Sequence, residues 1–143
     1  MKRECMEKQT MKNETSLICL KGKIFSGTGE GAKFMELPWV KRQMEEKLGF
    51  VPYPGTLNIK LSKDKVKLKN LLKRAKPIEI LPAEGYCHGK CFKAHLAKGL
   101  ECAIVLPQVR GYPEDVIEII APVNLREKLQ LKDGDIIEVM VAP

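Results

Sequence analysis

Apolar residues alternate with other residues over several short stretches of the chain, and this spacing predicts strands. The first two stretches cover residues 18–24 and 56–61. In the second stretch Leu57, Ile59 and Leu61 share one face, so Thr56 and Asn58 lie on the opposite face. The second half of the chain predicts further strands over residues 78–81, 91–96, 102–106, 116–121 and 136–141.

A helix is predicted over residues 38–48. Val40, Met44 and Leu48 recur every four residues, so they share one helical face. Pro38 suits the first helical turn, and Gly49 suits the left-handed residue that follows the last turn. The start, the buried face and the end of this helix are therefore all visible in the sequence.

Weaker signals complete the pattern. Asn124 can cap a short helix that runs to Leu129, and Asp133-Gly134 is typical of a turn before the last strand. The basic stretch of residues 63–76 has the spacing of a helical turn. Many short strands with few short helices favour a closed barrel over a layered parallel sheet. We expect a flexible tail over residues 1–16 and a single, mainly β domain with short flanking helices over residues 17–143.

The composition is that of a globular protein with a basic surface. Apolar residues make up 44% of the chain and charged residues 30%, which argues against disorder. The net charge of +7 favours an anionic partner, such as nucleic acid or a phosphorylated small molecule. A solvated basic face is the plainer interpretation of most of this charge, because the lysines are spread along the chain.

The chain carries no sign of a membrane or secretory segment. No apolar stretch reaches the ~20 residues of a membrane helix, and the polar first sixteen residues do not resemble a signal-peptide core. The five cysteines are an odd number and cannot all pair internally. We expect a monomer in the reducing cytoplasm, with free thiols and no membrane contact.

A cluster of cysteines and histidines raises the alternative of a metal site. Its members are Cys87, His88, Cys91, His95 and Cys102. Structural zinc sites usually show a tighter Cys-x2-Cys spacing than the one between Cys87 and Cys91. Structural thiols are therefore favoured over zinc.

A glycine-rich loop is the first candidate for chemistry. It comprises Gly27, Thr28, Gly29, Glu30, Gly31 and Ala32. Glycines let the backbone turn sharply, and successive N–H groups can then face phosphate oxygens. The spacing is neither that of a P-loop nor that of the dinucleotide-binding fingerprint. A plain connection between a strand and a helix is the alternative.

Thr56 and Asn58 are the second candidate, since residues two apart on a strand face the same way. A hydroxyl and an amide oxygen are hard, neutral ligands that suit a magnesium ion whose other ligands are waters and phosphates. Two solvent-facing polar residues on an amphipathic strand are the alternative interpretation.

The third candidate is the segment 116–126, VIEIIAPVNLR. Glu118 interrupts a strand that is apolar on both faces, and a carboxylate there costs free energy unless it is paired or placed at a site. An exposed edge position is the alternative. Arg126 could meet an anion, or it could pair with Glu127 or Asp133.

Taken together and in this order, these segments resemble the archaeal, CTP-dependent riboflavin kinases. The matching stretches are SGTGEGAKFMELP, GFVPYPGTLNIKL and DVIEIIAPVNLREKLQLKDGDIIEV, within a resemblance that covers residues 18–142. The resemblance implies a six-stranded barrel of the cradle-loop kind. It also implies transfer of the γ-phosphoryl group of CTP to the ribityl 5′-hydroxyl of riboflavin, which gives FMN and CDP.

The resemblance implies a role for each candidate segment. The loop from Gly27 to Ala32 would hold the nucleotide phosphates, and Thr56 and Asn58 would be ligands of Mg²⁺. Glu118 would bind riboflavin near its reacting hydroxyl, orient that hydroxyl and act as its base. Four consecutive residues would lie against the nucleotide and read the cytosine edge with backbone groups: Val123, Asn124, Leu125 and Arg126.

The chain departs from the family pattern at a flavin contact. Family members often carry a threonine before a His-Tyr-Pro run, whereas this chain has Arg110-Gly111-Tyr112-Pro113. The flavin contact therefore falls on Arg110, whose guanidinium can hold a phosphate or stack on an aromatic ring.

Other functions stay open at this stage. A nucleic-acid-binding barrel without catalysis agrees with the basic charge, but the chain lacks interleaved aromatics that would stack on bases. This alternative is therefore disfavoured. A flavin-binding module that has lost catalysis is a further alternative, against which the glycine-rich loop and the Thr-x-Asn pair argue.

Overall fold

The structure is a computed structural model, and it describes residues 17–74, 77–81, 89–108 and 110–141. The strands are β1 (Ile18–Phe25), β2 (Leu57–Leu61), β3 (Ile78–Ile80), β4 (Gly89–His95), β5 (Glu101–Pro107), β6 (Val116–Ile120) and β7 (Ile136–Val141). The helices are α2 (Glu30–Met35), α3 (Pro38–Leu48), α4 (Lys63–Lys69) and α5 (Leu125–Lys128), with short 3-10 turns η1 (Asn70–Arg74) and η2 (Ala97–Gly99).

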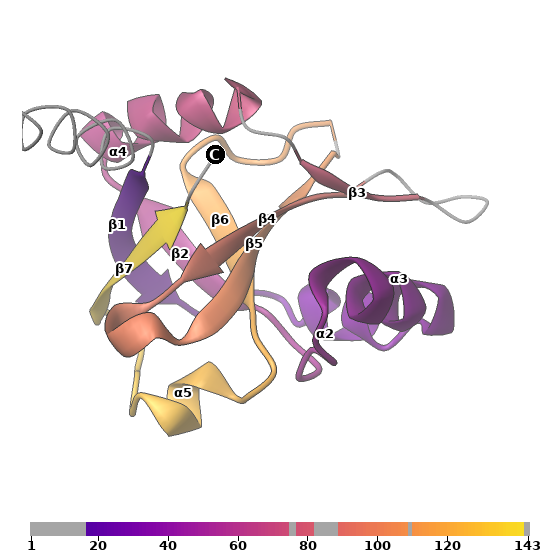
Figure 1. The fold of residues 1–143 in the computed structure, drawn as a ribbon. Coiled ribbons are helices and arrows are strands. Elements are labelled where there is room, and N and C mark those ends of the chain that lie inside the picture. Colours follow the sequence, from indigo (N-terminus) through magenta and orange to yellow (C-terminus); the bar gives the residue numbers. More distant parts are fainter. Residues whose placement is uncertain (1–16, 75–76, 82–88, 109, 142–143) are drawn as a thin grey trace, which may run out of the picture.

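Six of the strands close into an antiparallel barrel (Figure 1). The order around the barrel is β4-β5-β6-β2-β1-β7, and β7 returns to β4 through the pairs Ala94↔Val141 and His95↔Met140. The first part of β4 pairs instead with β3, so β3 extends from the barrel wall. The expected mainly β fold, with a six-stranded barrel and short flanking helices, is confirmed.

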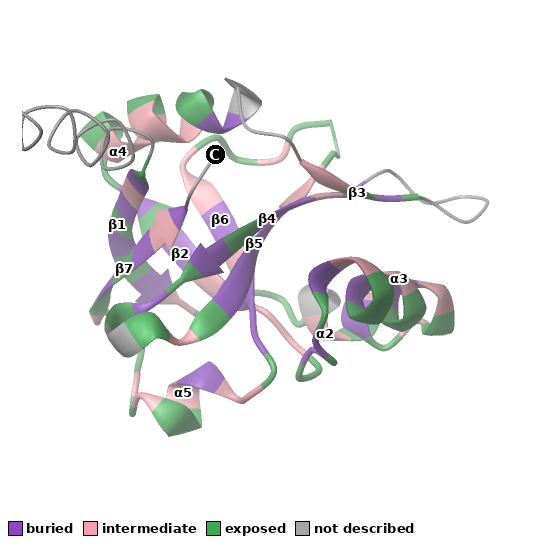
Figure 2. Ribbon diagram, in the orientation of Figure 1, coloured by how far each residue is buried: buried purple, intermediate pink, exposed green. Residues whose placement is uncertain are grey.

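The interior of the barrel is filled by the alternating apolar residues of its strands. From β1, Leu20 and Ile24 point inward, and from β2, Leu57 and Ile59 do so. Figure 2 shows buried stretches, in purple, along the barrel strands. Because successive side chains of a strand face opposite sides, the residues between them face outward, where ligands can reach them.

A second apolar core lies outside the barrel, where α3 covers β3, β4 and β5. Val40, Met44 and Leu48 of α3 are buried in it, and Gly49 ends the helix with a φ of 83°. This is the helix that the four-residue apolar spacing and its flanking residues predict. β4 and β5 therefore bury both faces, one against each core.

The cysteines and histidines of the expected cluster do not converge within the described part of the chain. Cys91 is buried in the outer core and Cys102 inside the barrel, while His95 is exposed. Cys87 and His88 lie outside the described residues. Among the residues that are described, no group of three or more His, Cys, Asp or Glu side chains could hold a metal ion.

The glycine-rich loop is shorter than the sequence predicts. We expected residues 27–32 to form a loop, but α2 begins at Glu30, so the loop ends at Gly29. Gly29 adopts a φ of 85° and turns the chain, and its carbonyl accepts from the backbone N–H of Lys33 at 3.4 Å. The residues that follow contain neither proline nor β-branched side chains, so they continue as a helix.

No helix among the described residues has the length and apolar character needed to cross a bilayer.

Candidate functional site

The candidate site lies on the outer face of the barrel, where β2 and β6 run side by side. Leu57 pairs with Ile119, and both point into the barrel interior. Asn58 lies directly opposite Glu118 in the same ladder, so these two side chains lie together on the outer face. Thr56, two residues before Asn58, belongs to this face as well.

Both oxygens of the Glu118 carboxylate accept hydrogen bonds. The Thr56 hydroxyl donates to Oε1 at 2.9 Å, and the Tyr112 phenol donates to Oε2 at 2.6 Å. Burial, together with the hydrogen bond and the charge of Glu118, raises the pKa of Tyr112 far above its usual value, so the phenol keeps its proton. Glu118 is thus a partly buried, paired carboxylate rather than an exposed edge residue.

Tyr112 is a site residue that sequence reasoning did not single out. It appears in the sequence only as part of the departing Arg110–Pro113 segment. The signal that could have identified Tyr112 was its aromatic side chain directly after the turn at Gly111. Its partner could not be inferred, because the contact depends on how the segment between β5 and β6 folds back over β6.

The glycine-rich loop packs directly against the side chain of Asn58. A β-carbon built on Gly27 would lie 2.4 Å from Nδ2 of Asn58, a separation that real β-carbons do not show. Phe25, at the end of β1, is the ladder partner of Asn58, so the loop leaves the barrel wall at this point. The loop, the Thr56–Asn58 pair and Glu118 therefore meet on one surface. Ala32 lies farther on, in the first turn of α2, and the side chains of Glu30 and Gly31 are outside the described part.

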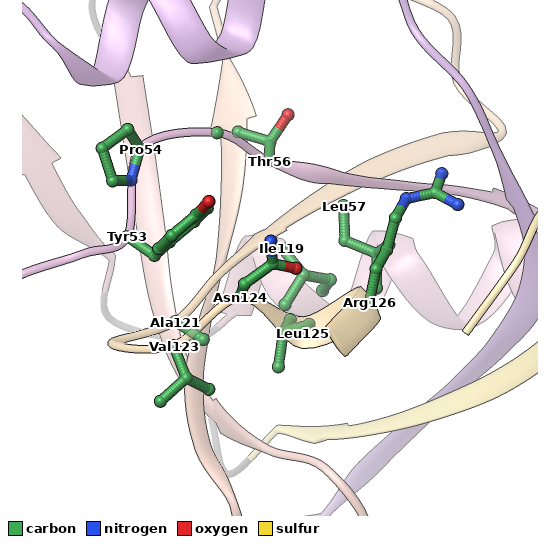
Figure 3. A pocket seen from close by; sticks show the side chains of 11 residues that line it. Tyr53, Pro54, Thr56, Leu57, Ile119, Ala121, Val123, Asn124, Leu125 and Arg126 are labelled. Atoms are coloured by element: carbon green, nitrogen blue, oxygen red, sulfur yellow. The ribbon is translucent and has the colours of Figure 1, made fainter. Parts of the chain in front are cut away.

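A cavity of about 180 Å³ adjoins this surface (Figure 3). Thr56 stands on the segment that leads into β2, and the residues 123–126 line the other side around the start of α5. The cavity therefore brings Thr56, an expected Mg²⁺ ligand, together with residues 123–126, which are expected to lie against the nucleotide. Tyr53, which the sequence left without a role, also lines it and is 46% exposed.

The start of α5 is held in place by its own side chains. Asn124 caps the helix as predicted, since its Oδ1 accepts from the backbone N–H of Glu127 at 3.2 Å. Arg126 donates to Asp133 at 2.8 Å and to the carbonyl of Phe25 at 3.4 Å. Of the partners considered for Arg126, the structure shows Asp133.

Asp133 also ties α5 to the glycine-rich loop. Its Oδ2 accepts from the Ser26 hydroxyl at 2.5 Å, while its Oδ1 accepts from Arg126. The hydrogen bond from Ser26 and then that from Arg126 lower the pKa of Asp133. Ser26 immediately precedes Gly27, so one carboxylate links the glycine-rich loop to Arg126, which lines the 180 Å³ cavity.

A second cavity, of about 560 Å³, contains Arg110 and Tyr112 on one side and Lys69 of α4 on the other. Lys69 donates to the carbonyls of Glu114 and Val116 at 2.9 and 3.1 Å, and burial lowers its pKa. Arg110 is exposed here and lines a different cavity from the residues 123–126. The Thr56–Glu118–Tyr112 chain of hydrogen bonds runs from a residue that lines the first cavity to a residue that lines the second.

Comparison with known proteins decides the family. The family model of the CTP-dependent riboflavin kinases, described as domain of unknown function DUF120, matches residues 24–141. The chain belongs to the CTP-dependent riboflavin kinase family. The match includes β1 from Ile24 onward, the glycine-rich loop, and every residue placed in the site above.

Curated relatives from several archaea carry the name riboflavin kinase. That of Archaeoglobus fulgidus is 41% identical over 143 residues, which cover 97% of this chain and 61% of the relative. That of Pyrobaculum aerophilum is 47% identical over 131 residues, or 87% of this chain and 60% of the relative. That of Ignicoccus hospitalis is 43% identical over 128 residues, or 87% of this chain and 71% of the relative. The chain thus spans about three fifths of the length of the first two riboflavin kinases.

The oxygen atoms of this family member's site suit a hard divalent cation. The hydroxyl of Thr56, the amide of Asn58 and the carboxylate of Glu118 share the outer face of β2 and β6. Because the Thr56 proton points to Glu118, the lone pairs of its oxygen stay free for a cation. Hard oxygen ligands of low total charge are what Mg²⁺ takes when waters and phosphates supply its remaining ligands.

Proposed function

We propose that this chain is a CTP-dependent riboflavin kinase, which transfers the γ-phosphoryl group of CTP to the ribityl 5′-hydroxyl of riboflavin and releases FMN and CDP. Membership of the family and the names of the relatives support this reaction. The observation that carries the proposal is the junction of Gly27, Asn58 and Glu118 on one face of the barrel. A phosphate-binding loop, oxygen ligands for a cation and a carboxylate are the parts that phosphoryl transfer to an alcohol needs.

The nucleotide would occupy the glycine-rich loop and the 180 Å³ cavity. The backbone of residues 27–32 would hold the phosphates, because Gly27 leaves no side chain between the loop and Asn58. Residues 123–126 would lie against the base, where the backbone around the Asn124 cap is fixed enough to distinguish one base edge from another.

Thr56 and Asn58 would hold Mg²⁺ beside the phosphates. When bound, the ion neutralises the charge that develops on the transferred group. Glu118 supports this arrangement through the Thr56 hydroxyl, whose hydrogen bond orients the oxygen.

Riboflavin would approach Glu118 from the side of the 560 Å³ cavity, where Arg110 contacts it. A carboxylate has about four lone-pair sites, and Thr56 and Tyr112 use one on each oxygen of Glu118. The ribityl hydroxyl can therefore donate to Glu118 without displacing either partner. As its oxygen bonds to the γ-phosphorus and the bond from that phosphorus to the β–γ bridging oxygen breaks, Glu118 accepts the proton, and CDP leaves with the bonding electrons.

The test is to incubate the purified protein with riboflavin, Mg²⁺ and each nucleoside triphosphate separately, and to separate the flavins and nucleotides by chromatography. The proposal expects FMN and CDP in equal amounts with CTP. Flavin binding without FMN formation would instead indicate a module without catalysis. Salt-dependent binding of RNA or DNA, again without FMN, would favour a nucleic-acid-binding barrel.

A further inference from the structure

Tyr112 connects the Glu118 carboxylate with the 560 Å³ cavity. Its phenol donates to Oε2 of Glu118, and its ring lines the 560 Å³ cavity. Thr56, the other donor to Glu118, lines the 180 Å³ cavity. The carboxylate is therefore held between the two cavities by one donor from each.

From this geometry we propose that Tyr112 is a positioning residue of the riboflavin kinase reaction: it fixes the Glu118 carboxylate in the orientation that meets the ribityl hydroxyl. The inference rests on the proposed function. A carboxylate bound by Thr56 alone could rotate about its last bond, because one acceptor contact leaves that torsion free. A second donor on the other oxygen removes this freedom, so the group is oriented before the substrate arrives.

The segment that carries Tyr112 is itself anchored, so the phenol has a fixed place. Lys69 donates to the carbonyls of Glu114 and Val116, which follow Tyr112 in the chain. The backbone N–H of Val116 bonds to the carbonyl of Pro113 at 3.3 Å, which closes a turn beside Tyr112. A freely moving loop would not hold a carboxylate, whereas this one is tied to α4 and to β6.

The chemistry of a phenol suits this task. Its hydroxyl keeps its proton through the physiological range, so it stays a donor to the carboxylate and does not compete for the substrate proton. It adds no charge beside the transferred phosphoryl group. The ribityl hydroxyl is thus left as the group that Glu118 deprotonates.

The test compares the wild type with Tyr112→Phe, Glu118→Gln and the double variant. We expect Tyr112→Phe to lower kcat/KM for riboflavin about 10- to 100-fold, the size expected for one lost hydrogen bond to a charged group. The KM for CTP should change less than about twofold, and the melting temperature should stay near that of the wild type, because the ring is retained. In the Glu118→Gln background, Tyr112→Phe should cost little more, since residues that act as a unit are not additive.

Asp115→Asn is the matched control. Asp115 lies in the same segment, and its exposed carboxylate makes a contact of 3.9 Å with Lys60 and attracts the Lys69 ammonium. We expect this variant to leave the riboflavin and CTP parameters unchanged. Quenching of riboflavin fluorescence gives the dissociation constant of each variant independently of turnover.

The outcomes separate the inference from the proposed function. An active wild type with an equally active Tyr112→Phe variant would overturn the role of Tyr112 and leave the kinase assignment standing. Full additivity in the double variant would show that Tyr112 does not act through Glu118. A Tyr112→Phe variant that loses stability and raises the KM for both substrates equally would show a merely structural role. A wild type that makes no FMN would overturn both proposals.

Discussion

The missing β-carbon of Gly27 would lie 2.4 Å from the Asn58 side-chain nitrogen, so the glycine-rich loop and the outer face of β2 are in direct contact at this point. The backbone is held on both sides of this contact. Asn58 pairs with Phe25 and Glu118 in the strand ladders, and the Ser26 hydroxyl donates a hydrogen bond to Asp133. The fit between the loop and the strand therefore depends on the absence of a side chain at position 27.

Gly27→Ala should displace the loop from Asn58 and weaken nucleotide binding. A shift of about 1 Å in a positioning element can reduce the rate about 100-fold, and we expect a loss of that order in kcat/KM for CTP. Gly89→Ala is the matched control. Its β-carbon would meet the nearest atom, on Ile80, at an ordinary 3.7 Å, and Gly89 itself lines neither of the two cavities. Steady-state kinetics of both variants test the contact, and equal losses would contradict it.

Glu118→Gln should lower kcat for FMN formation by about 100-fold or more, the contribution typical of a general base. The amide keeps the length of the side chain and can still accept from Thr56 or Tyr112, so folding should be preserved. Glu101→Gln, an exposed position at the start of β5, is the control and should behave as the wild type. An unchanged turnover number in Glu118→Gln would mean that Glu118 is not the base.

Local signals predicted those parts of the fold that local interactions determine. The bounds of α3 follow from Pro38, the four-residue apolar spacing and Gly49. β7 has the bounds that its apolar pattern indicates. The closure of the barrel, by contrast, rests on pairs such as Ala94↔Val141, whose register no local pattern specifies. The number and shortness of the strands favoured a closed barrel, and the resemblance of the ordered motifs implied its six strands.

In the candidate site, too, local signals predict some residues and miss others. Thr56 and Asn58 could be placed on one face because strand alternation fixes the direction of each side chain, whereas Glu118 joins them through the non-local pairing of β2 with β6. The phenol donor of Tyr112 could not be predicted, because its contact depends on the path of an irregular segment. For Arg126, the sequence left both Glu127 and Asp133 open as partners, and the turn before β7 brings Asp133 within hydrogen-bonding distance. α2 was missed because its first residues lie within the glycine-rich motif.

Replacing both Thr56 and Asn58 by alanine should raise the Mg²⁺ concentration needed for half-maximal rate by about tenfold or more, since even residues behind a metal's ligands change affinity by that amount. A titration of the initial rate with MgCl₂ at saturating CTP measures the effect. Ser62→Ala is the control. Ser62 stands at the N-terminal cap of α4, where its side chain makes no capping hydrogen bond, so the Mg²⁺ requirement should stay unchanged. An unaltered requirement in the double variant would remove Thr56 and Asn58 from the metal site.

Asp133→Asn should raise the KM for CTP several-fold while kcat changes little, because the link between Ser26 and Arg126 positions the nucleotide segments without touching the transferred group. The pKa of Asp133 is lowered in the folded protein, so the charged link is intact above the usual carboxyl pKa and is lost only as the pH falls through the lower, folded value. The KM for CTP of Asp133→Asn should therefore exceed that of the wild type throughout the neutral pH range.

The control for this variant is Asp64→Asn, in the exposed first turn of α4. Its KM for CTP should equal that of the wild type between pH 6 and 8. A KM for CTP that Asp133→Asn leaves unchanged would show that the link does not contribute to nucleotide binding.

Cys91 and Cys102 should stay protonated and unreactive in the folded protein. Burial raises the pKa of each thiol from 9.0 to about 12, and both side chains are fully enclosed. Alkylation with iodoacetamide at pH 8, followed by mass spectrometry of the peptides, should label the half-buried Cys19 faster than either of them. Labelling of Cys91 and Cys102 at the rate of Cys19 would contradict the packing of the two cores.

The same pKa shifts predict how stability depends on pH. A thiol whose pKa is raised on folding stabilises the folded state fully below the unfolded pKa, and this contribution falls as the pH rises towards the folded pKa of about 12. Between pH 8 and pH 10 the two thiols together should therefore cost about 3 kcal/mol of unfolding free energy. In urea unfolding over this interval, the Cys91→Ala/Cys102→Ala variant should lose about 3 kcal/mol less than the wild type. Equal losses of unfolding free energy in the wild type and the double variant would show that these thiols ionise as readily in the folded chain as in the unfolded one.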